Sequence, residues 1–162
     1  MSFTATLDTS EWTKWISGTA GKLKDVGKLL AAAASLFAFK DIMDHFSKEE
    51  GPDSSWQKRS PATQIAYGKI AAGIWAPPRG MRAGSFSPSN KLLQLTGNLR
   101  QSINPGHMTV KRDSVTIFAN APYSAVHDEG GKNMPARPFM WLNDEVQDKM
   151  LDVILTMATE GT

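Results

Sequence analysis

The sequence has no cysteine among its 162 residues. Disulfide bonds, thiolate zinc sites and cysteine nucleophiles are therefore excluded, and the redox compartment stays undecided. Long hydrophobic runs are missing too: the longest, LLAAAASLFAF at residues 29–39, would rise about 16 Å as a helix, roughly half of a ~30 Å hydrocarbon core. The start, MSFTATLDTSEW, lacks a basic and an apolar segment, so we expect neither a membrane span nor a secretory signal.

Acidic residues are absent from one long stretch. Residues 54–112 hold nine Lys and Arg but no Asp or Glu, whereas the rest of the chain holds nine basic and 16 acidic residues. This separation favours binding to a polyanion or head-to-tail contact between copies of the chain; a solvated basic loop without function is the alternative. The candidate residues for contact with DNA in a lumen or with a neighbouring subunit are Lys58, Arg59, Arg79, Arg82, Lys91, Arg100, Lys111 and Arg112.

The hydrophobic spacing predicts a single α+β domain over residues 1–162. Apolar residues at helical spacing predict a long helix over about residues 22–48 and a closing helix over about 143–159. Alternating residues predict a strand in SFTATLD and a hairpin in MTVKRDSVTIFANA, and EWTKWIS predicts a short helix between strand and long helix. We therefore expect a small antiparallel sheet packed against the long helix and the C-terminal helix.

Residues 51–90 predict an extended arm that is rich in Gly, Pro and Ser and carries five positive charges. A helix in PATQIAYGKIAAGI is expected inside it, with Pro61 in its first turn. A segment of this length with little periodicity is usually functional, or becomes ordered against a partner. Because Trp56, Trp75 and Phe86 are costly to expose, we expect them to dock on protein.

Two short helices flank the predicted hairpin. In LLQLTGNLRQSI, Leu99 and Ile103 fall on one face and Thr96 is the expected N-cap. In APYSAVHDEGG, Pro122 would open a helix and two glycines would close it. We expect Tyr123 and the nearby valine to pack inward, and the DEGG segment to enter solvent.

The segment ARPFMWL predicts a rigid approach to the last helix. Pro135 and Pro138 stiffen the backbone on both sides of Arg137 and remove two N–H donors. A guanidinium held this way loses little entropy on binding and can hold a carboxylate of its own chain or of a neighbour. We therefore favour a structural or subunit contact for Arg137 over a catalytic role. Phe139 and Trp141 would then anchor the helix in the core.

Ser124, His127 and Asp128 include the residue types of a hydrolase triad. On one helix, however, Asp128 projects about 100° away from His127. Triads also draw their members from separate segments, and no GxSxG motif is present. A small hydrolase centred on His127 is therefore the least favoured of the functions considered.

Metal and cofactor sites have equally little support. The consecutive residues HDE at 127–129 would splay around a helix rather than converge. His45 and Asp41 have i, i+4 spacing but no third ligand nearby, and no phosphate-binding glycine motif occurs. We expect no catalytic residue, no metal and no cofactor.

Three motifs in order resemble a known protein family. The chain is similar to the Mu-like virion morphogenesis family, the tail-completion and head–tail joining proteins of tailed phages. Their hallmarks are a TGxLxxSI step, a YAxxHxxG turn and a PxRPFL segment. The matching residues are Thr96, Gly97, Leu99, Ser102 and Ile103; Tyr123, Ser124, His127 and Gly130; and Pro135, Arg137, Pro138 and Phe139.

The sequence departs from these motifs at Ser124, where the family often has Ala, and at Met140, where Leu is common. The resemblance implies a non-enzymatic subunit of the phage neck, assembled in the host cytoplasm. It implies a homo-oligomeric ring, six-fold favoured and twelve-fold possible, between connector and tail-tube proteins, with double-stranded DNA passing through non-specifically and no membrane involved. The alternative is a stand-alone protein that binds nucleic acid without sequence preference through basic and aromatic residues.

Overall fold

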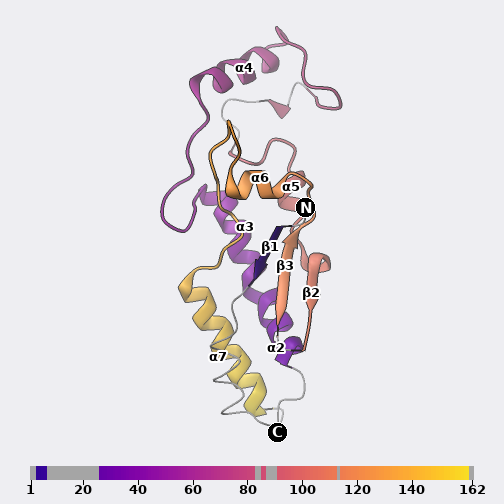
Figure 1. Ribbon diagram of the computed structural model, residues 1–162, viewed down its shortest axis with the longest axis vertical. Coiled ribbons are helices and arrows are strands. Elements are labelled where there is room, and N and C mark those ends of the chain that lie inside the picture. Colours follow the sequence, from indigo (N-terminus) through magenta and orange to yellow (C-terminus); the bar gives the residue numbers. More distant parts are fainter. Residues whose placement is uncertain (1–2, 7–25, 83–84, 87–90, 113, 161–162) are drawn as a thin grey trace.

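The computed structural model describes residues 3–6, 26–82, 85–86, 91–112 and 114–160. The molecule is elongated: a sheet and two long helices occupy one end, and an arm with its own helix occupies the other (Figure 1). The expected α+β class is confirmed. The short helix predicted in EWTKWIS lies outside the described residues.

One continuous helix is the central element of the core. It consists of α2 (Val26–Ala33), a π-helical turn η1 (Ala34–Ala38) and α3 (Phe39–Lys48). Its apolar stripe is buried as predicted, with Leu30, Ile42 and Phe46 each almost fully buried. The π turn was not predicted; in it the N–H of Phe39 donates to the carbonyl of Ala34, five residues back.

The sheet has three antiparallel strands in the order β1 (Phe3–Thr6), β3 (Val115–Ala119), β2 (Met108–Val110). The predicted first strand and hairpin are confirmed. Alternate residues of β3 are buried, and β2 and β3 both contact α2. The approach is closest at Gly27, whose N–H donates to the carbonyl of Arg112 at 2.8 Å. A Cβ there would lie 1.7 Å from the carbonyl oxygen of Lys111, so only glycine fits.

The C-terminal helix α7 (Asp144–Glu160) packs along α2 and buries Met150 and Ile154, as the sequence predicted. Figure 1 shows α7 to the left of α2 and β2 to its right. Among the helices of the described residues, none has the length and hydropathy to cross a membrane.

The arm begins after Glu49, whose left-handed backbone (φ 59°) ends α3. Its helix α4 (Pro61–Ala71) has Pro61 in the first turn, as predicted, and is capped by Ser60. Trp56 and Phe86 are buried, which confirms that they dock on protein. Trp75 does not dock within the chain: it is 48% exposed, with the Lys69 ammonium 4.6 Å from its ring centre.

The short helix α5 (Asn98–Gln101) starts differently from the prediction. Its N-cap is Gly97, at φ 75°, rather than Thr96. The Thr96 hydroxyl accepts only a long bond, 3.4 Å, from the N–H of Asn98. Leu99 and Ile103 are both buried, as predicted, and a 3-10 turn η3 (Pro105–His107) then leads into β2.

A buried polar cluster joins α3 to the start of α7. The backbone N–H of Asn143 donates to Asp41 Oδ2 at 2.8 Å, and its side-chain amide donates to Oδ1 at 2.5 Å. His45 Nδ1 lies 3.2 Å from the carbonyl of Phe139, and the His45 ring stacks on Trp141 at 4.0 Å. Asp41 and His45 therefore serve as structural ties between elements. No cluster of three metal-ligating side chains occurs within the described ranges.

This cluster gives a first prediction. Replacing Asp41 with Ala leaves the start of α7 without its acceptor, so we expect a loss of about 1–3 kcal/mol in the free energy of unfolding. Urea denaturation followed by circular dichroism measures the loss. Asp44→Ala, a less buried position on the same helix, is the control and should change stability by less than about 0.5 kcal/mol. Equal losses in the two variants would contradict the assigned role.

Candidate functional site

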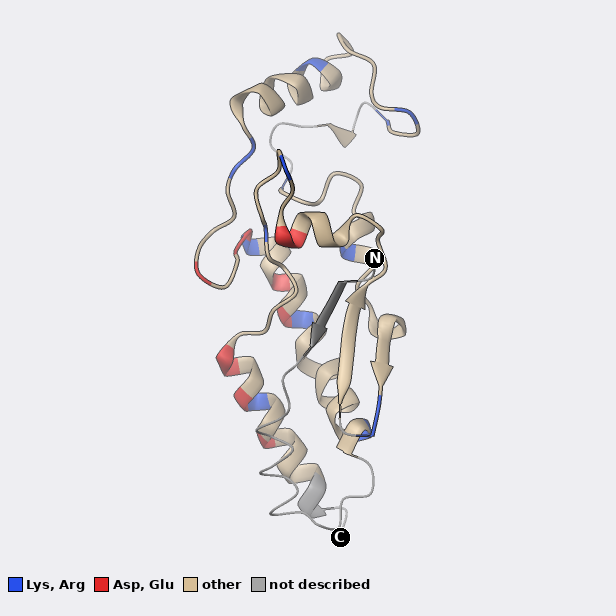
Figure 2. Ribbon diagram, viewed as in Figure 1, with Lys and Arg blue, Asp and Glu red and all other residues tan. Residues whose placement is uncertain are grey.

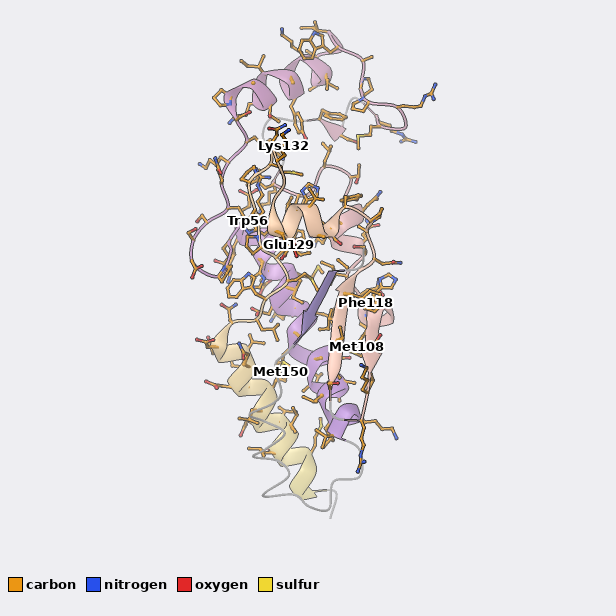
Figure 3. All side chains as sticks on the ribbon, viewed as in Figure 1. Trp56, Met108, Phe118, Glu129, Lys132 and Met150 are labelled. Carbon is orange, nitrogen blue, oxygen red and sulfur yellow. The ribbon has the colours of Figure 1, made fainter. Side chains whose placement is uncertain are left out.

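A groove of about 1030 Å³ opens between the arm and the adjoining end of the core. Its walls come from the start of the arm and α4, from the loop before α5, from α6 (Ser124–Glu129) and from the loop after α6. Figure 3 shows side chains from the arm and the core facing one another here, with Lys132 at the tip of the loop after α6. All three sequence motifs contribute lining residues: Thr96, Leu99, Tyr123, His127, Pro135 and Arg137.

The helix α6 presents the opposite face from the one predicted. Ser124 and Asp128, one turn apart, point into the core, whereas Tyr123 and Val126 are 39% and 45% exposed. The prediction that Asp128 enters solvent and Tyr123 and Val126 pack inward was wrong. Pro122 also lies ahead of the helix, because the N-cap is Tyr123. Two apolar side chains are thereby turned toward the groove.

Asp128 faces inward because the backbone beyond it needs an acceptor. Its Oδ1 atom accepts from the N–H of Phe139 at 2.8 Å and from the N–H of Met140 at 3.1 Å. Burial raises the pKa of Asp128 above its ordinary value, and the two backbone bonds oppose that rise without cancelling it. Phe139 is fully buried, as predicted, and packs against Phe46 with ring centres 5.2 Å apart.

Arg137 holds the arm instead of a carboxylate. Its Nε and Nη2 atoms both donate to the carbonyl of Gln57, at 3.1 and 3.0 Å. Beside it, the Trp56 indole N–H donates to the carbonyl of Pro138 at 2.8 Å. Within the described part of the chain no carboxylate forms an ion pair with Arg137, so a carboxylate from a neighbouring subunit stays a prediction. Burial, followed by the charge of Arg59, lowers the pKa of the guanidinium.

The loop between α6 and Arg137 folds back tightly on itself. Gly130 has φ 87°, and a Cβ there would lie 2.8 Å from the backbone nitrogen of Ala136. Gly131 and Met134 form an isolated antiparallel bridge, and the N–H of Arg137 donates to the carbonyl of His127 at 2.8 Å. The predicted glycine end of the helix is confirmed, and it projects residues 131–134 toward the arm.

Ser124, His127 and Asp128 are not connected as a triad. The Ser124 hydroxyl donates to the carbonyl of Ala119 at 3.3 Å, and the Asp128 carboxylate is occupied by the two backbone N–H groups. His127 Nδ1 is buried and makes no hydrogen bond to any described residue. Burial, and then the charge of Arg137, lowers the pKa of His127, which favours the neutral ring. The ring packs edge-on against Tyr123.

The structure distributes the predicted basic residues over several places (Figure 2). Lys58 and Arg59 line the groove, and Arg59 also donates to the carbonyl of Lys91 at 2.9 Å. The Lys91 ammonium in turn donates to the carbonyl of Ser47. Arg100 Nε lies 3.4 Å from Met43 Sδ on α3. Two exposed pairs lie apart from these. Arg79 and Arg82 are on the arm after α4, and Lys111 and Arg112 are on the loop between β2 and β3.

The three sequence motifs thus form one structural unit, and a comparison over the whole chain agrees with them. A model described as the phage virion morphogenesis family matches residues 8–158. The chain belongs to this family. No curated protein and no solved structure gives a significant match. Membership in the phage virion morphogenesis family establishes a structural or assembly role in a phage virion.

Sequence reasoning missed several residues of this unit. It did not assign Gln57 as the acceptor for Arg137, Lys132 as a wall of the groove, or Asp128 as a buried acceptor. The PxRPF motif did carry a usable signal for Asp128: its stiff backbone leaves the N–H groups after Pro138 without a local helix or strand partner. A side-chain acceptor was therefore required, but nothing in the local pattern named it.

Asp128 gives a second prediction. Both backbone donors use Oδ1, so Asp128→Asn keeps the acceptor without a buried charge, whereas Asp128→Ala removes it. At pH 7 we expect the Asn variant to lie within about 1 kcal/mol of the wild type, and the Ala variant to lose about 1–3 kcal/mol. Urea denaturation measures both.

The pH dependence follows from the raised pKa of Asp128. The folded state binds this proton more tightly than the unfolded state, so the wild type loses stability as the pH rises from the ordinary aspartate pKa through the raised one. Lowering the pH from 7 to about 4 should therefore shift the stability difference between wild type and Asp128→Asn in favour of the wild type. A difference that stays constant, or moves the other way, would contradict the buried charge.

Proposed function

We propose that this chain is a structural subunit of the phage neck, forming a homo-oligomeric ring at the head–tail junction around the DNA channel. The observation that carries the proposal is the match of residues 8–158 to the phage virion morphogenesis family. Ser124, Asp128 and Arg137 are buried and engage backbone groups of their own chain. Such residues shape a joint between segments, and the subunit acts without covalent catalysis.

The charge distribution supports a subunit that meets copies of itself. Acidic residues recur along α7 and also occur on α3 and α6, while the arm has more basic than acidic residues (Figure 2). Unlike surfaces at separate places on one subunit favour head-to-tail contacts, which close into a ring when the rotation permits. Exposed pairs such as Lys111 and Arg112 would meet DNA phosphates without reading bases.

The same distribution counts against a stand-alone nucleic-acid-binding protein. Such a protein needs a basic face with accessible aromatic side chains. Here Trp56 and Phe86 are buried, and Arg59, Lys91 and Arg100 contact other parts of the chain. Of the arm's three predicted stacking residues, Trp56, Trp75 and Phe86, only Trp75 is exposed.

The position in the virion is tested by imaging. Cryo-electron microscopy of complete particles should place the chain in a closed ring between the portal-bearing head and the tail tube. Particles produced without the chain should contain heads and tails that fail to join, or tails that are incomplete. Finding complete, infectious particles that lack the chain at the junction would contradict the proposal.

The absence of catalysis is tested at Ser124. Ser124→Ala removes one 3.3 Å hydrogen bond, which should cost at most about 1.5 kcal/mol of stability. Because the proposal gives the hydroxyl no chemical role, particle yield and infectivity should stay within a few-fold of wild type in a plaque assay. A variant that is as stable as wild type but yields inactive or uncleaved products would instead indicate an enzyme.

A further inference from the structure

The groove between the arm and α6 combines an apolar lining with positive charge. Four of its lining residues are basic, Lys58, Arg59, Lys132 and Arg137, and none of its described lining residues is acidic. Leucine and methionine side chains from the loops, together with Tyr123 and Val126, supply the apolar part. An occupant that matches this surface presents carboxylates beside apolar side chains.

Arg137 strengthens the preference of the groove for a negatively charged occupant. It is only 7% exposed and donates to a carbonyl rather than to a carboxylate. Burial lowers its pKa most, the charge of Arg59 lowers it further, and Glu49 opposes these effects more weakly. A buried cation that forms no ion pair with any described residue is costly, so an incoming carboxylate at this wall is favoured. The exposed positions Lys58 and Lys132 lie along the same groove and extend the preference toward its rim.

The chain itself carries a matching surface at a distance from the groove. On α7 the exposed residues Asp144, Asp148 and Asp152 recur every fourth position, so they form one stripe. The half-buried Leu151 and Leu155 lie next to that stripe. Figure 2 shows α7 away from the arm, at the opposite end of the core. One copy therefore cannot use its own stripe, but a second copy can.

We propose that the groove of one subunit binds the acidic stripe of α7 from the next subunit. The contact is head-to-tail, because the groove and the stripe are different surfaces, and it repeats from subunit to subunit. A cavity of about 1030 Å³ has room for several side chains of a helix face. The inference rests on the proposed homo-oligomeric ring and names the surfaces that would join its subunits.

The absence of cysteine permits a direct test by disulfide crosslinking of the full-length chain. Lys132→Cys and Asp148→Cys together place one thiol at the groove and one on the stripe. Under mild oxidation, in purified particles and in concentrated protein, non-reducing gels should show a ladder of crosslinked oligomers. A mixture of the two single variants should give dimers only, and each single variant alone should give none.

The matched control keeps the α7 thiol and moves the other one. Lys111→Cys with Asp148→Cys places its second thiol on the loop between β2 and β3, which is exposed and outside the groove. It should give no ladder. If particles or solution oligomers contain the chain but the Lys132 pair fails to crosslink, or crosslinks no better than the control, the proposed contact is wrong while the ring stands. If the chain is monomeric and absent from particles, both proposals fall.

Charge reversal tests recognition by a second route. Lys58→Glu with Lys132→Glu, or Asp148→Lys with Asp152→Lys, should shift the oligomer toward monomer at least tenfold in concentration, measured by light scattering after size exclusion. The four changes together should restore assembly. Lys111→Glu with Arg112→Glu changes the net charge by the same amount as the groove variant and should leave assembly unchanged. If circular dichroism shows that all variants are folded but the fourfold variant does not assemble, the proposed pairing of groove and stripe is wrong.

Discussion

The backbone between Arg137 and Asn143 is held by side chains from three different parts of the chain. Asp128 of α6 accepts from two of its N–H groups, Asp41 of α3 accepts from a third, and Trp56 of the arm donates to a carbonyl just before them. A segment without helix or strand cannot be buried unless such partners exist. The relative positions of α6, α3, α7 and the arm all depend on this segment.

This dependence explains why the sequence motifs look like a reactive site. Buried carboxylates, a half-buried histidine and an arginine between prolines are also what catalysis uses. Here Ser124, Asp128 and Arg137 bond to peptide groups, and the His127 Nδ1 atom is buried without a hydrogen bond to any described residue. Ser124, Asp128 and Arg137, residue types that active sites also use, therefore fix the path of the chain here.

The regular elements could be predicted because their signals are local. The stripe of α2 and α3, the alternation in β3 and the proline at the start of α4 each occupy a few turns or residues. The orientation of α6 could not be predicted this way. Hydropathy places Tyr123 and Val126 inside, but the demand of Phe139 and Met140 for an acceptor, 11 and 12 residues further on, decides the rotation. The acceptor for Arg137 lies 80 residues away, beyond any local pattern.

The π turn at Ala34–Ala38 sets the angular phase between the two halves of the long helix. One surplus residue rotates everything after it by roughly 100° relative to an unbroken α-helix. The first half aims its apolar side chains at the sheet and α7, and the second aims Asp41 and His45 at the segment before α7. The two halves of the helix thus present their contact residues in different directions, and this single π turn determines the angle between those directions.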